Sequence, residues 1–313
     1  MKKAFEDSRR FYNDHVAPMI RESFPEYESR IAVGIAGEGS DCFGYDDLMS
    51  RDHDYGTGVC LWLTDEDYAG IGHDLSDKYN ALIKAEGITL TARLTERRGV
   101  MTIHDFYSNN LNIDCDTNGV YLTQNEWLSL DHNCLATAVN GEVFRDDLGN
   151  FTAFRNYLLD YYPDRAWKYR IVNELHTFSA ALQVNYARCM TRNDIVAAKL
   201  CQSKGLEAAM QLFFLMKRVY PPYYKWTYRR LTEIDEDGRF AQLIRELADL
   251  KADPEAWTDT SYSPVSINMN DRVIFISEQI AFMIANMMKE LGLIKINDPY
   301  LERYVDEILN GLR

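Results

Sequence analysis

The stretch GEGSDCFGYDDLMSRDHDYG constrains this chain more than any other part of it. It places Gly39 and Ser40 twelve residues ahead of an Asp-x-Asp pair, Asp52 and Asp54, and the apolar run Val59–Leu63 follows. On a strand, side chains two positions apart share one face, so the two carboxylates can bind one hard cation such as Mg²⁺. A Gly-Ser turn offers backbone N–H groups and a hydroxyl to a phosphate. The stretch therefore predicts a site for a metal ion and a triphosphate.

Composition indicates a folded protein and disfavours a nucleic-acid partner. The 313 residues are 46% hydrophobic and 12% aromatic, which is enough for two domains or one large one. The formal net charge is −14, from 48 acidic and 34 basic residues. Binding to DNA or RNA requires Lys and Arg to neutralise phosphates, so this balance disfavours a nucleic-acid partner. It is compatible with a cationic small-molecule acceptor.

The cysteines and the N-terminus predict a cytoplasmic protein. None of the six cysteines forms a C-x-x-C motif or a Cys/His cluster with zinc spacing, which is typical of reduced thiols. The first residues, MKKAFEDSRRFYND, lack the apolar core of a signal peptide. No apolar run approaches the roughly 18 residues of a membrane span, so we expect no membrane association.

The first part of the chain alternates helices and strands. Apolar spacing and turn residues predict a helix over 3–22, strands over 30–35 and 54–63, a helix over 64–85, and strands over 88–94 and 100–103. Thr64 is a suitable N-cap residue with Asp67 three positions later, and Gly87 suits the end of that helix. Pro18 is expected to kink or shorten the first helix.

From about residue 123 the pattern is almost entirely helical. The predicted helices span 126–130, 151–161, 167–190, 194–219, 240–250 and 274–293. We therefore expect an α+β protein, with a small N-terminal mixed sheet and helices over residues 1–122. A C-terminal helical bundle, expected to bind the acceptor substrate, would occupy residues 123–313.

The glycine and aspartate pattern resembles that of the nucleotidyltransferase superfamily. The residues that show this resemblance are Gly39-Ser40, Gly44, and Asp52-x-Asp54, which leads into an apolar strand. The superfamily includes DNA polymerase β, the aminoglycoside and lincosamide nucleotidyltransferases, and enzymes that modify proteins or tRNA ends. The resemblance implies the polymerase β type of fold for the N-terminal domain.

A longer string is similar to a bacterial branch of that superfamily, described mostly as a domain of unknown function. The string includes Ser40-Asp41, Asp46-Asp47 and Ser50-Arg51-Asp52-His53-Asp54. Later pieces that fit the branch are Gly141-x-Val143-Phe144-x-Asp146, Tyr161-Tyr162-Pro163 and Pro222-Tyr223-Tyr224-Lys225-Trp226. The resemblance covers about residues 30–230.

This resemblance implies nucleotidyl transfer, in which an acceptor hydroxyl attacks the α-phosphorus of a nucleoside triphosphate and pyrophosphate leaves. Negative charge gathers on phosphoryl oxygens, and two Mg²⁺ ions can stabilise it. Asp52 and Asp54 would bind the metals. Gly39 and Ser40 would hold the β- and γ-phosphates. ATP is the expected nucleotide.

Such enzymes usually need a third carboxylate on a neighbouring strand, to bind the catalytic metal or to deprotonate the acceptor. Asp105, Asp114 and Glu96 are the candidates. Asp105 is favoured because it extends the strand predicted over 100–103.

Three further residues are candidates for nucleotide binding. Lys225 lies in an aromatic run and matches the family string, so it is expected to reach the triphosphate as a point charge. Arg51, beside the acids, supports the loop or contacts a phosphate. Asp41 is a possible outer ligand of the metal site or a solvated loop acid.

Two other functions are compatible with the same residues. The acceptor can be a protein side chain or a tRNA end, although the acidic charge counts against RNA. Without a third carboxylate near the metals, the chain would bind nucleotide without transferring it.

Overall fold

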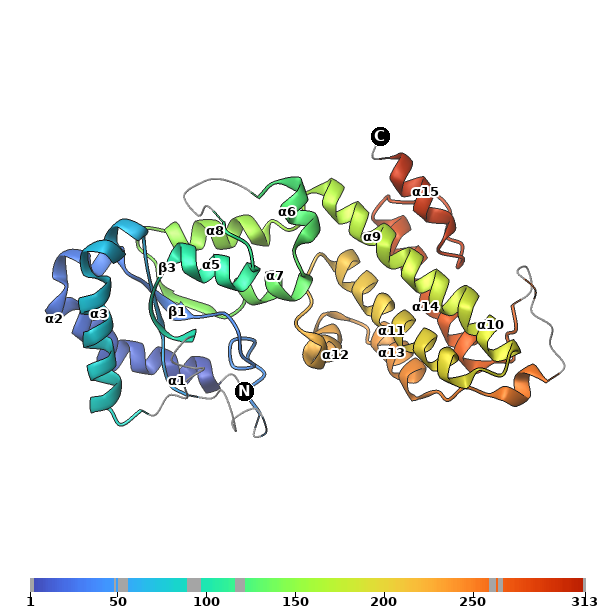
Figure 1. Cartoon of the computed structure of the whole chain (residues 1–313), viewed down its shortest axis with the longest axis horizontal. Helices are drawn as coiled ribbons and strands as arrows, with labels where there is room; N and C mark the ends of the chain where they lie inside the picture. Colours follow the sequence, from blue (N-terminus) through green and yellow to red (C-terminus); the bar gives the residue numbers. More distant parts are fainter. Residues whose placement is uncertain are drawn as a thin grey trace. The chain divides into compact units, whose positions relative to one another are not determined.

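A computed structural model describes residues 3–47, 49, 56–88, 97–115, 122–258, 263 and 267–311 (Figure 1). Within these residues the protein is α+β, with a small mixed sheet and many helices. The chain forms two compact units, Met1–Tyr161 and Tyr162–Arg313. The sequence pattern predicts the boundary between the two units at residue 123 instead.

The sheet of the first unit is mixed and has the strand order β3-β2-β1-β4. Its strands are β1 (Ala32–Ile35), β2 (Cys60–Leu63), β3 (Gly99–Thr102) and β4 (Glu142–Arg145). The central strand β1 runs antiparallel to β2 and to β4, and β2 runs parallel to β3. The predicted strands at 30–35 and 100–103 are therefore present. The second strand is shorter than the predicted 54–63, because residues 56–59 are described and do not belong to a strand. Residues 54–55 and nearly all of the strand predicted over 88–94 lie outside the described residues.

The strand register defines two opposite edges of the sheet. Gly34 of β1 pairs with Cys60, and Cys60 pairs with Gly99, so β1 ends where β2 and β3 begin. Ile35 pairs with Glu142, so β4 also begins there. We call this the turn edge, because the Gly-Ser turn follows β1. The opposite edge is where β2 and β3 end, with Leu63 paired to Thr102.

The N-terminal helix continues past Pro18 with a change of winding. It consists of α1 (Lys3–Phe11), a π-helical turn η1 (Tyr12–Val16) and α2 (Ala17–Ser23), followed by a 3₁₀ turn η2 (Pro25–Arg30). Pro18 lacks an N–H and its ring crowds the preceding turn. The wider π turn lies immediately before it, which is one of the usual ways a helix accommodates such a local disturbance.

Helix α3 (Asp65–Ala85) begins and ends as its sequence predicts. The Thr64 side chain accepts a hydrogen bond from the Asp67 N–H at 3.2 Å. At the other end, Gly87 has φ +66°, a conformation that glycine adopts without a steric penalty. The helix therefore lies in a defined position after β2.

Helices cover both faces of the sheet (Figure 1). On one face, Leu61 and Leu63 pack with side chains of α1 to α3, in a cluster that includes Leu75. On the other face, the Trp62 ring stacks on Phe151 at 3.8 Å between centroids, and its edge meets Phe106 at 5.3 Å. Burial of aromatic rings of this size dominates the core energy of a small domain. The sheet is therefore the interior of the first unit.

The segment 123–161 completes the first unit rather than beginning the second. It contains α6 (Gln124–Ser129), α7 (His132–Val139), β4 and α8 (Asn150–Leu159), and α5 (Ile103–Leu111) precedes it. β4 pairs with the central strand, and Phe151 of α8 stacks on Trp62. The helical pattern from residue 123 is real, but these contacts keep its first part with the sheet.

The second unit is a helical bundle. Its elements are α9 (Asp164–Phe178), the π turn η3 (Ser179–Asn185), α10 (Tyr186–Thr191), α11 (Ile195–Lys217), α12 (Tyr224–Ile234), α13 (Arg239–Asp249), the 3₁₀ turn η4 (Pro254–Trp257), α14 (Arg272–Glu290) and α15 (Arg303–Asn310). Helix α11 lies at the centre and packs on α9, α10, α12, α13 and α14. Trp167 donates its indole N–H to the Leu215 carbonyl at 2.9 Å, which joins α9 to α11. Among the described helices, none has the length and apolarity needed to cross a bilayer.

Candidate functional site

The residues after β1 form a tight turn at the turn edge. Gly37, Gly39 and Gly44 have φ values of +104°, +124° and +71°, which side-chain-bearing residues adopt only with strain. The Tyr45 N–H donates to the Ser40 carbonyl at 2.8 Å, which closes the turn around Ser40. The pattern of glycines in the sequence is thus a backbone requirement of this turn.

An asparagine anchors the start of the turn to the strand that pairs with β1. The Gly37 N–H donates to Asn140 Oδ1 at 2.8 Å, and Asn140 Nδ2 donates to the Gly37 carbonyl at 2.8 Å. Asn140 directly precedes Gly141 and β4. Two reciprocal hydrogen bonds fix the turn relative to the sheet, which keeps its backbone groups in place without a ligand. Sequence reasoning did not identify Asn140, although it adjoins the family string at Gly141.

A buried ion pair stabilises the turn. Arg98 Nη2 lies 2.8 Å from Asp41 Oδ2, and the two side chains are 0% and 3% exposed. The other oxygen of Asp41 accepts the Cys42 N–H at 2.9 Å. The same guanidinium lies 3.1 Å from the Cys42 sulfur. The two oxygens of Asp41 therefore bind Arg98 and the Cys42 N–H of the same turn. The sequence predicts instead a contact with the nucleotide or an outer position at the metal site.

Arg98 also connects the turn to β3, where sequence reasoning missed it. Its Nη1 donates to the Ala36 carbonyl at 3.5 Å, and its backbone precedes Gly99. Beside it, Arg97 forms an ion pair with Glu38. The sign of these contacts in the sequence is a pair of arginines directly ahead of a predicted strand. Both guanidinium groups are paired with carboxylates of the turn, so they stabilise its structure.

Ser40 and Gly39 occupy the middle of this turn. Ser40 is 9% exposed. A Cβ on Gly39 would overlap the Asp41 carboxylate, so only glycine fits there. The backbone of the turn is therefore held close to a buried charge pair, in a conformation that glycine alone permits.

The Asp-x-Asp pair lies outside the described residues. Asp52, Asp54 and Arg51 belong to residues 50–55, so their predicted roles in metal and nucleotide binding remain predictions. Gly56 and Thr57 are the next described residues, four and three positions ahead of β2. Thr57 lines a small polar cavity of about 170 Å³ with side chains of α1, η1 and the end of α3: Asp7, Arg10, Phe11, Asp14, His15, Glu86 and Ile88.

Asp105 does not extend a strand, which corrects the reason for favouring it. β3 ends at Thr102, and α5 begins at Ile103. The Thr102 hydroxyl accepts the Asp105 N–H at 2.8 Å, so Asp105 lies in the first turn of a helix. A threonine three residues ahead of an aspartate is a common helix start, and here it outweighs the β-rich run before it.

Two of the three candidate acids meet at one histidine. His104 Nε2 lies 2.8 Å from Asp114, and its Nδ1 lies 3.8 Å from Asp105. The hydrogen bond to Asp114 raises the pKa of His104. Because His104 directly follows the end of β3, this cluster starts from the edge opposite the Gly-Ser turn. Neither acid is placed beside the turn by the topology.

The third candidate, Glu96, also lies outside the described residues, but its neighbour in the chain does not. Arg97 pairs with Glu38 at the turn edge. In the sequence Glu96 directly precedes Arg97 and lies three residues ahead of β3, which begins at that edge. The order along the chain therefore favours Glu96 over Asp105 and Asp114 as the third acid.

Lys225 lies in the second unit, in the first turn of α12. Its ammonium is 5.3 Å from the Tyr223 ring and 5.4 Å from the Trp226 ring. The residue is exposed. Its amine is thus held by aromatic rings at the surface of the bundle, which is compatible with a cation–π role and with ligand binding alike.

No group of three or more His, Cys, Asp or Glu side chains with metal-binding geometry occurs among the residues that the structure describes. Asp52, Asp54 and Glu96 are outside that set, so the Mg²⁺ site stays a prediction.

Comparison with known proteins gives one match. A family model for a domain of unknown function, DUF4037, matches residues 127–227. No curated protein matches the chain. No solved structure matches it either. The chain is therefore similar to this family over the last part of the first unit and the first part of the second, a stretch that includes Gly141 and Lys225.

Proposed function

We propose that the protein is a Mg²⁺-dependent nucleotidyltransferase that transfers AMP from ATP to a hydroxyl of a small-molecule acceptor. The observation that carries the proposal is the Gly-Ser turn at the end of β1. It is stabilised by Asn140 and Arg98, and it lies at the edge where β2 and β3 begin. In the sequence the Asp-x-Asp pair precedes β2 and Glu96 precedes β3, and both of these strands begin at this edge.

The reaction requires little covalent participation from the protein. The acceptor oxygen forms a bond to the α-phosphorus, the bond to the bridging oxygen of pyrophosphate breaks, and the acceptor proton passes to a base. Bound Mg²⁺ would neutralise charge on the phosphoryl oxygens. Asp52 and Asp54 would hold the metal, and Glu96 would complete its ligands or accept the proton. Backbone N–H groups near Gly39 and Ser40 would receive the terminal phosphates.

The decisive experiment measures ATP binding and pyrophosphate release in Mg²⁺. The wild type should bind ATP, and Asp54→Ala should lower turnover more than about a hundredfold, because a metal ligand is lost. Asp114→Asn, which removes an exposed carboxylate at the opposite edge, is the matched control and should leave turnover unchanged. A wild type that neither binds nor turns over any nucleoside triphosphate would refute the proposal.

The acceptor class needs a separate test. Labelled ATP incubated with whole lysate and the enzyme should transfer label to small molecules. Label recovered only on protein or on RNA would assign the transfer to a macromolecular acceptor instead.

A nucleotide-binding module without transfer is the second candidate, since two of the three candidate acids start from the opposite edge. In that case Asp54→Ala would weaken ATP binding, the wild type would release no pyrophosphate, and Glu96→Gln would change neither measurement.

A further inference from the structure

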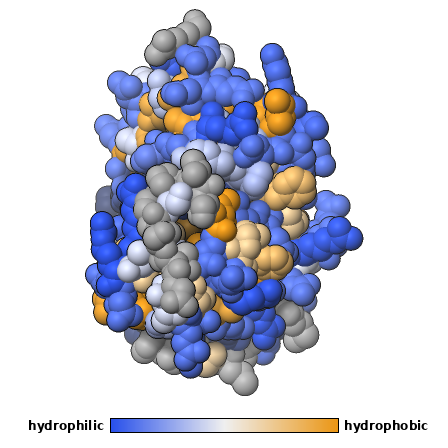
Figure 2. Space-filling model, turned by 90° about the vertical axis from the view of Figure 1, so that its right-hand side faces the viewer, coloured by the Kyte–Doolittle hydropathy of each residue, from blue (hydrophilic) through white to orange (hydrophobic). Residues whose placement is uncertain are grey.

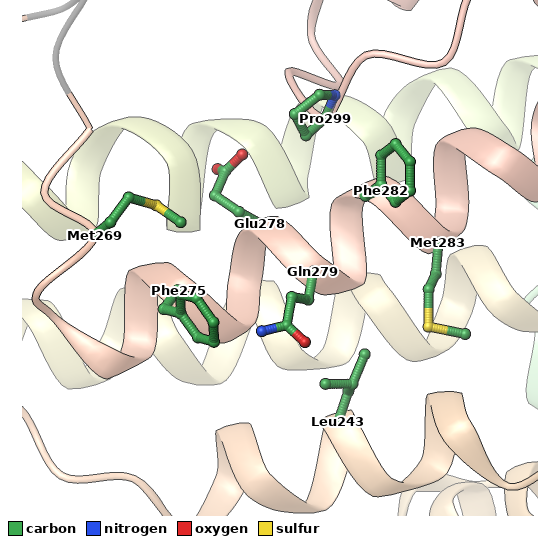
Figure 3. Close-up of a pocket in the computed structure, with 8 residues that line it drawn as sticks. All are labelled: Leu243, Met269, Phe275, Glu278, Gln279, Phe282, Met283 and Pro299. Carbon is green, nitrogen blue, oxygen red and sulfur yellow. The ribbon is translucent and has the colours of Figure 1, made fainter.

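A hollow in the second unit combines apolar walls with one carboxyl group (Figure 3). Its volume is about 360 Å³, within the range of small-molecule sites, which is roughly 300–1,000 Å³. It is lined from α13, α14 and the segments that flank α14: Leu243, Met269, Phe275, Glu278, Gln279, Phe282, Met283 and Pro299. The hollow lies entirely within the second unit. It is therefore independent of the nucleotidyl-transfer proposal.

The carboxyl group of Glu278 is held in place by an amide from the π turn. Gln183 Nε2 donates to Glu278 Oε1 at 2.9 Å and to the Pro299 carbonyl at 2.7 Å. Gln183 Oε1 accepts the Leu301 N–H at 3.1 Å. Gln183 lies in η3, where the helix widens between α9 and α10. Such π turns frequently occur at functional sites. Here the amide orients Glu278 and the Pro299 segment together.

Within the described part of the chain, Glu278 has no cationic partner. The nearest arginines along the chain are committed elsewhere, with Arg272 paired to Glu246 and Arg303 to Asp298. Its neighbour Gln183 is a neutral donor. Burial raises the pKa of Glu278, and the Gln183 hydrogen bond opposes that rise only in part. A carboxylate in apolar surroundings without a counter-ion is unfavourable, so this position is complementary to a positive charge.

The surrounding side chains suit an apolar body attached to that charge. Phe282 and Met269 are 46% and 47% exposed, so both offer apolar surface to a ligand in the hollow. Glu278 and Phe282 point toward the Pro299 segment, whereas Gln279 and Met283 point toward Leu243 (Figure 3). Aromatic faces and thioethers attract organic cations as well as apolar groups. The face of the molecule in Figure 2 likewise carries apolar patches within a mostly hydrophilic surface.

We propose that this hollow binds a small organic cation with an apolar body, a protonated alkyl or aryl amine, and that Glu278 is its counter-ion. The amine would lie at the free carboxylate oxygen, and its apolar part would cover Phe282 and Met269.

The test is calorimetric titration of the full chain with 4-phenylbutylamine and, separately, with its neutral analogue 4-phenylbutanol, at about pH 8. The amine should bind about tenfold more tightly than the alcohol, as expected for one charged contact. Glu278→Gln keeps the shape and the Gln183 contact, and it should abolish this preference. Glu290→Gln, at an exposed position of the same helix, should retain it. Phe282→Ala should weaken both ligands.

Several distinct results would contradict the proposed amine site. Equal binding of amine and alcohol by the wild type, or no binding of either, would overturn the proposal. So would an unchanged preference in Glu278→Gln, provided its circular dichroism and melting match the wild type. A chain that is dimeric in solution, and that Phe282→Ala converts to a monomer, would instead identify the hollow as a self-association surface.

Discussion

At the scale of single residues, charges at the turn edge decide how the Gly-Ser turn is built. Asp41 reads in the sequence as one more acid in an acidic loop, yet it is buried against Arg98. The sequence carries no sign of that partner, because the two residues are 57 positions apart. Pattern and spacing identify the residues that the turn needs locally, namely its glycines, but not the long-range contacts that stabilise it.

The Arg98–Asp41 pair predicts a large loss of stability when one partner is removed. Arg98→Met leaves a carboxylate buried without a counter-ion, which should lower the free energy of unfolding of the first unit by about 3–5 kcal/mol. Urea denaturation at pH 7 measures it. Arg10→Met removes an exposed arginine from its pair with Asp7 and should change little. A comparable small change in Arg98→Met would show that the pair is not important for folding.

The third carboxylate is also a question of single residues. If the proposed transfer is correct, Glu96→Gln should lower turnover about tenfold or more while Asp105→Asn leaves it unchanged, because Glu96 precedes β3 in the sequence, whereas Asp105 follows the opposite end of that strand. Pyrophosphate release under saturating ATP is the measurement. The reverse ranking of the two variants would place the catalytic acid at the start of α5.

At the scale of elements, local signals predicted ends of helices better than ends of strands. The Thr64 cap and Gly87 fix α3 as expected, since both act through hydrogen bonds within a few residues. The same Thr-x-x-Asp logic applies at Thr102, but the β-rich run before it obscured the helix start. β4 has only partly buried residues and four positions, so its sequence has no strong strand pattern. Only its pairing with β1 defines it.

The pairing of β4 depends on Gly141. Its φ is +72°, and a Cβ there would overlap the Ile35 carbonyl. Gly141→Ala should therefore weaken the β1–β4 pairing and lower the free energy of unfolding by about 2–4 kcal/mol. Gly149→Ala is the matched control, since its φ is +75° but nothing lies near the added carbon. Gly149→Ala should lower the free energy of unfolding by only about 1 kcal/mol, because alanine is disfavoured there by the positive φ alone. Thermal melts of both variants compare them, and equal losses would contradict this account.

At the scale of the whole molecule, two units share one chain, and the boundary illustrates what composition can predict. Helical periodicity predicted an almost entirely helical chain from about residue 123, and the strand β4 lies within that part. It did not show that the first helices pack on the sheet, because periodicity reports which face is apolar and not what covers it. The contacts of Phe151 and β4 place the boundary after Tyr161.

The second unit should respond to pH through Glu174. Burial, and next the charge of Glu207, raise the pKa of Glu174 from 4.5 to about 7, against the opposing effect of Arg170. The folded state therefore binds the proton more tightly than the unfolded state. The contribution of Glu174 to the free energy of unfolding is complete below about pH 4.5 and is lost as the pH rises to about 7. We expect a loss of about 2 kcal/mol across that window, less than the full shift because the side chain is partly exposed.

The substitution Glu174→Gln tests this dependence. The variant should be more stable than the wild type at pH 8 and not at pH 4.5, as measured by urea denaturation at both values. Glu290→Gln, exposed on α14, should follow the wild type at both. A Glu174→Gln variant whose stability parallels the wild type at every pH would show that the carboxyl titrates normally.

The position of β4 in the chain also affects how the protein is made. Strand β1 is synthesised before both of its neighbours, and its second neighbour, β4, follows about eighty residues after β2. At about 5–20 residues per second, one side of β1 stays without its partner for roughly 4–16 s. An unpaired strand edge is a template for association with other chains. The nascent first unit therefore exposes a strand edge for several seconds that the finished unit covers with β4.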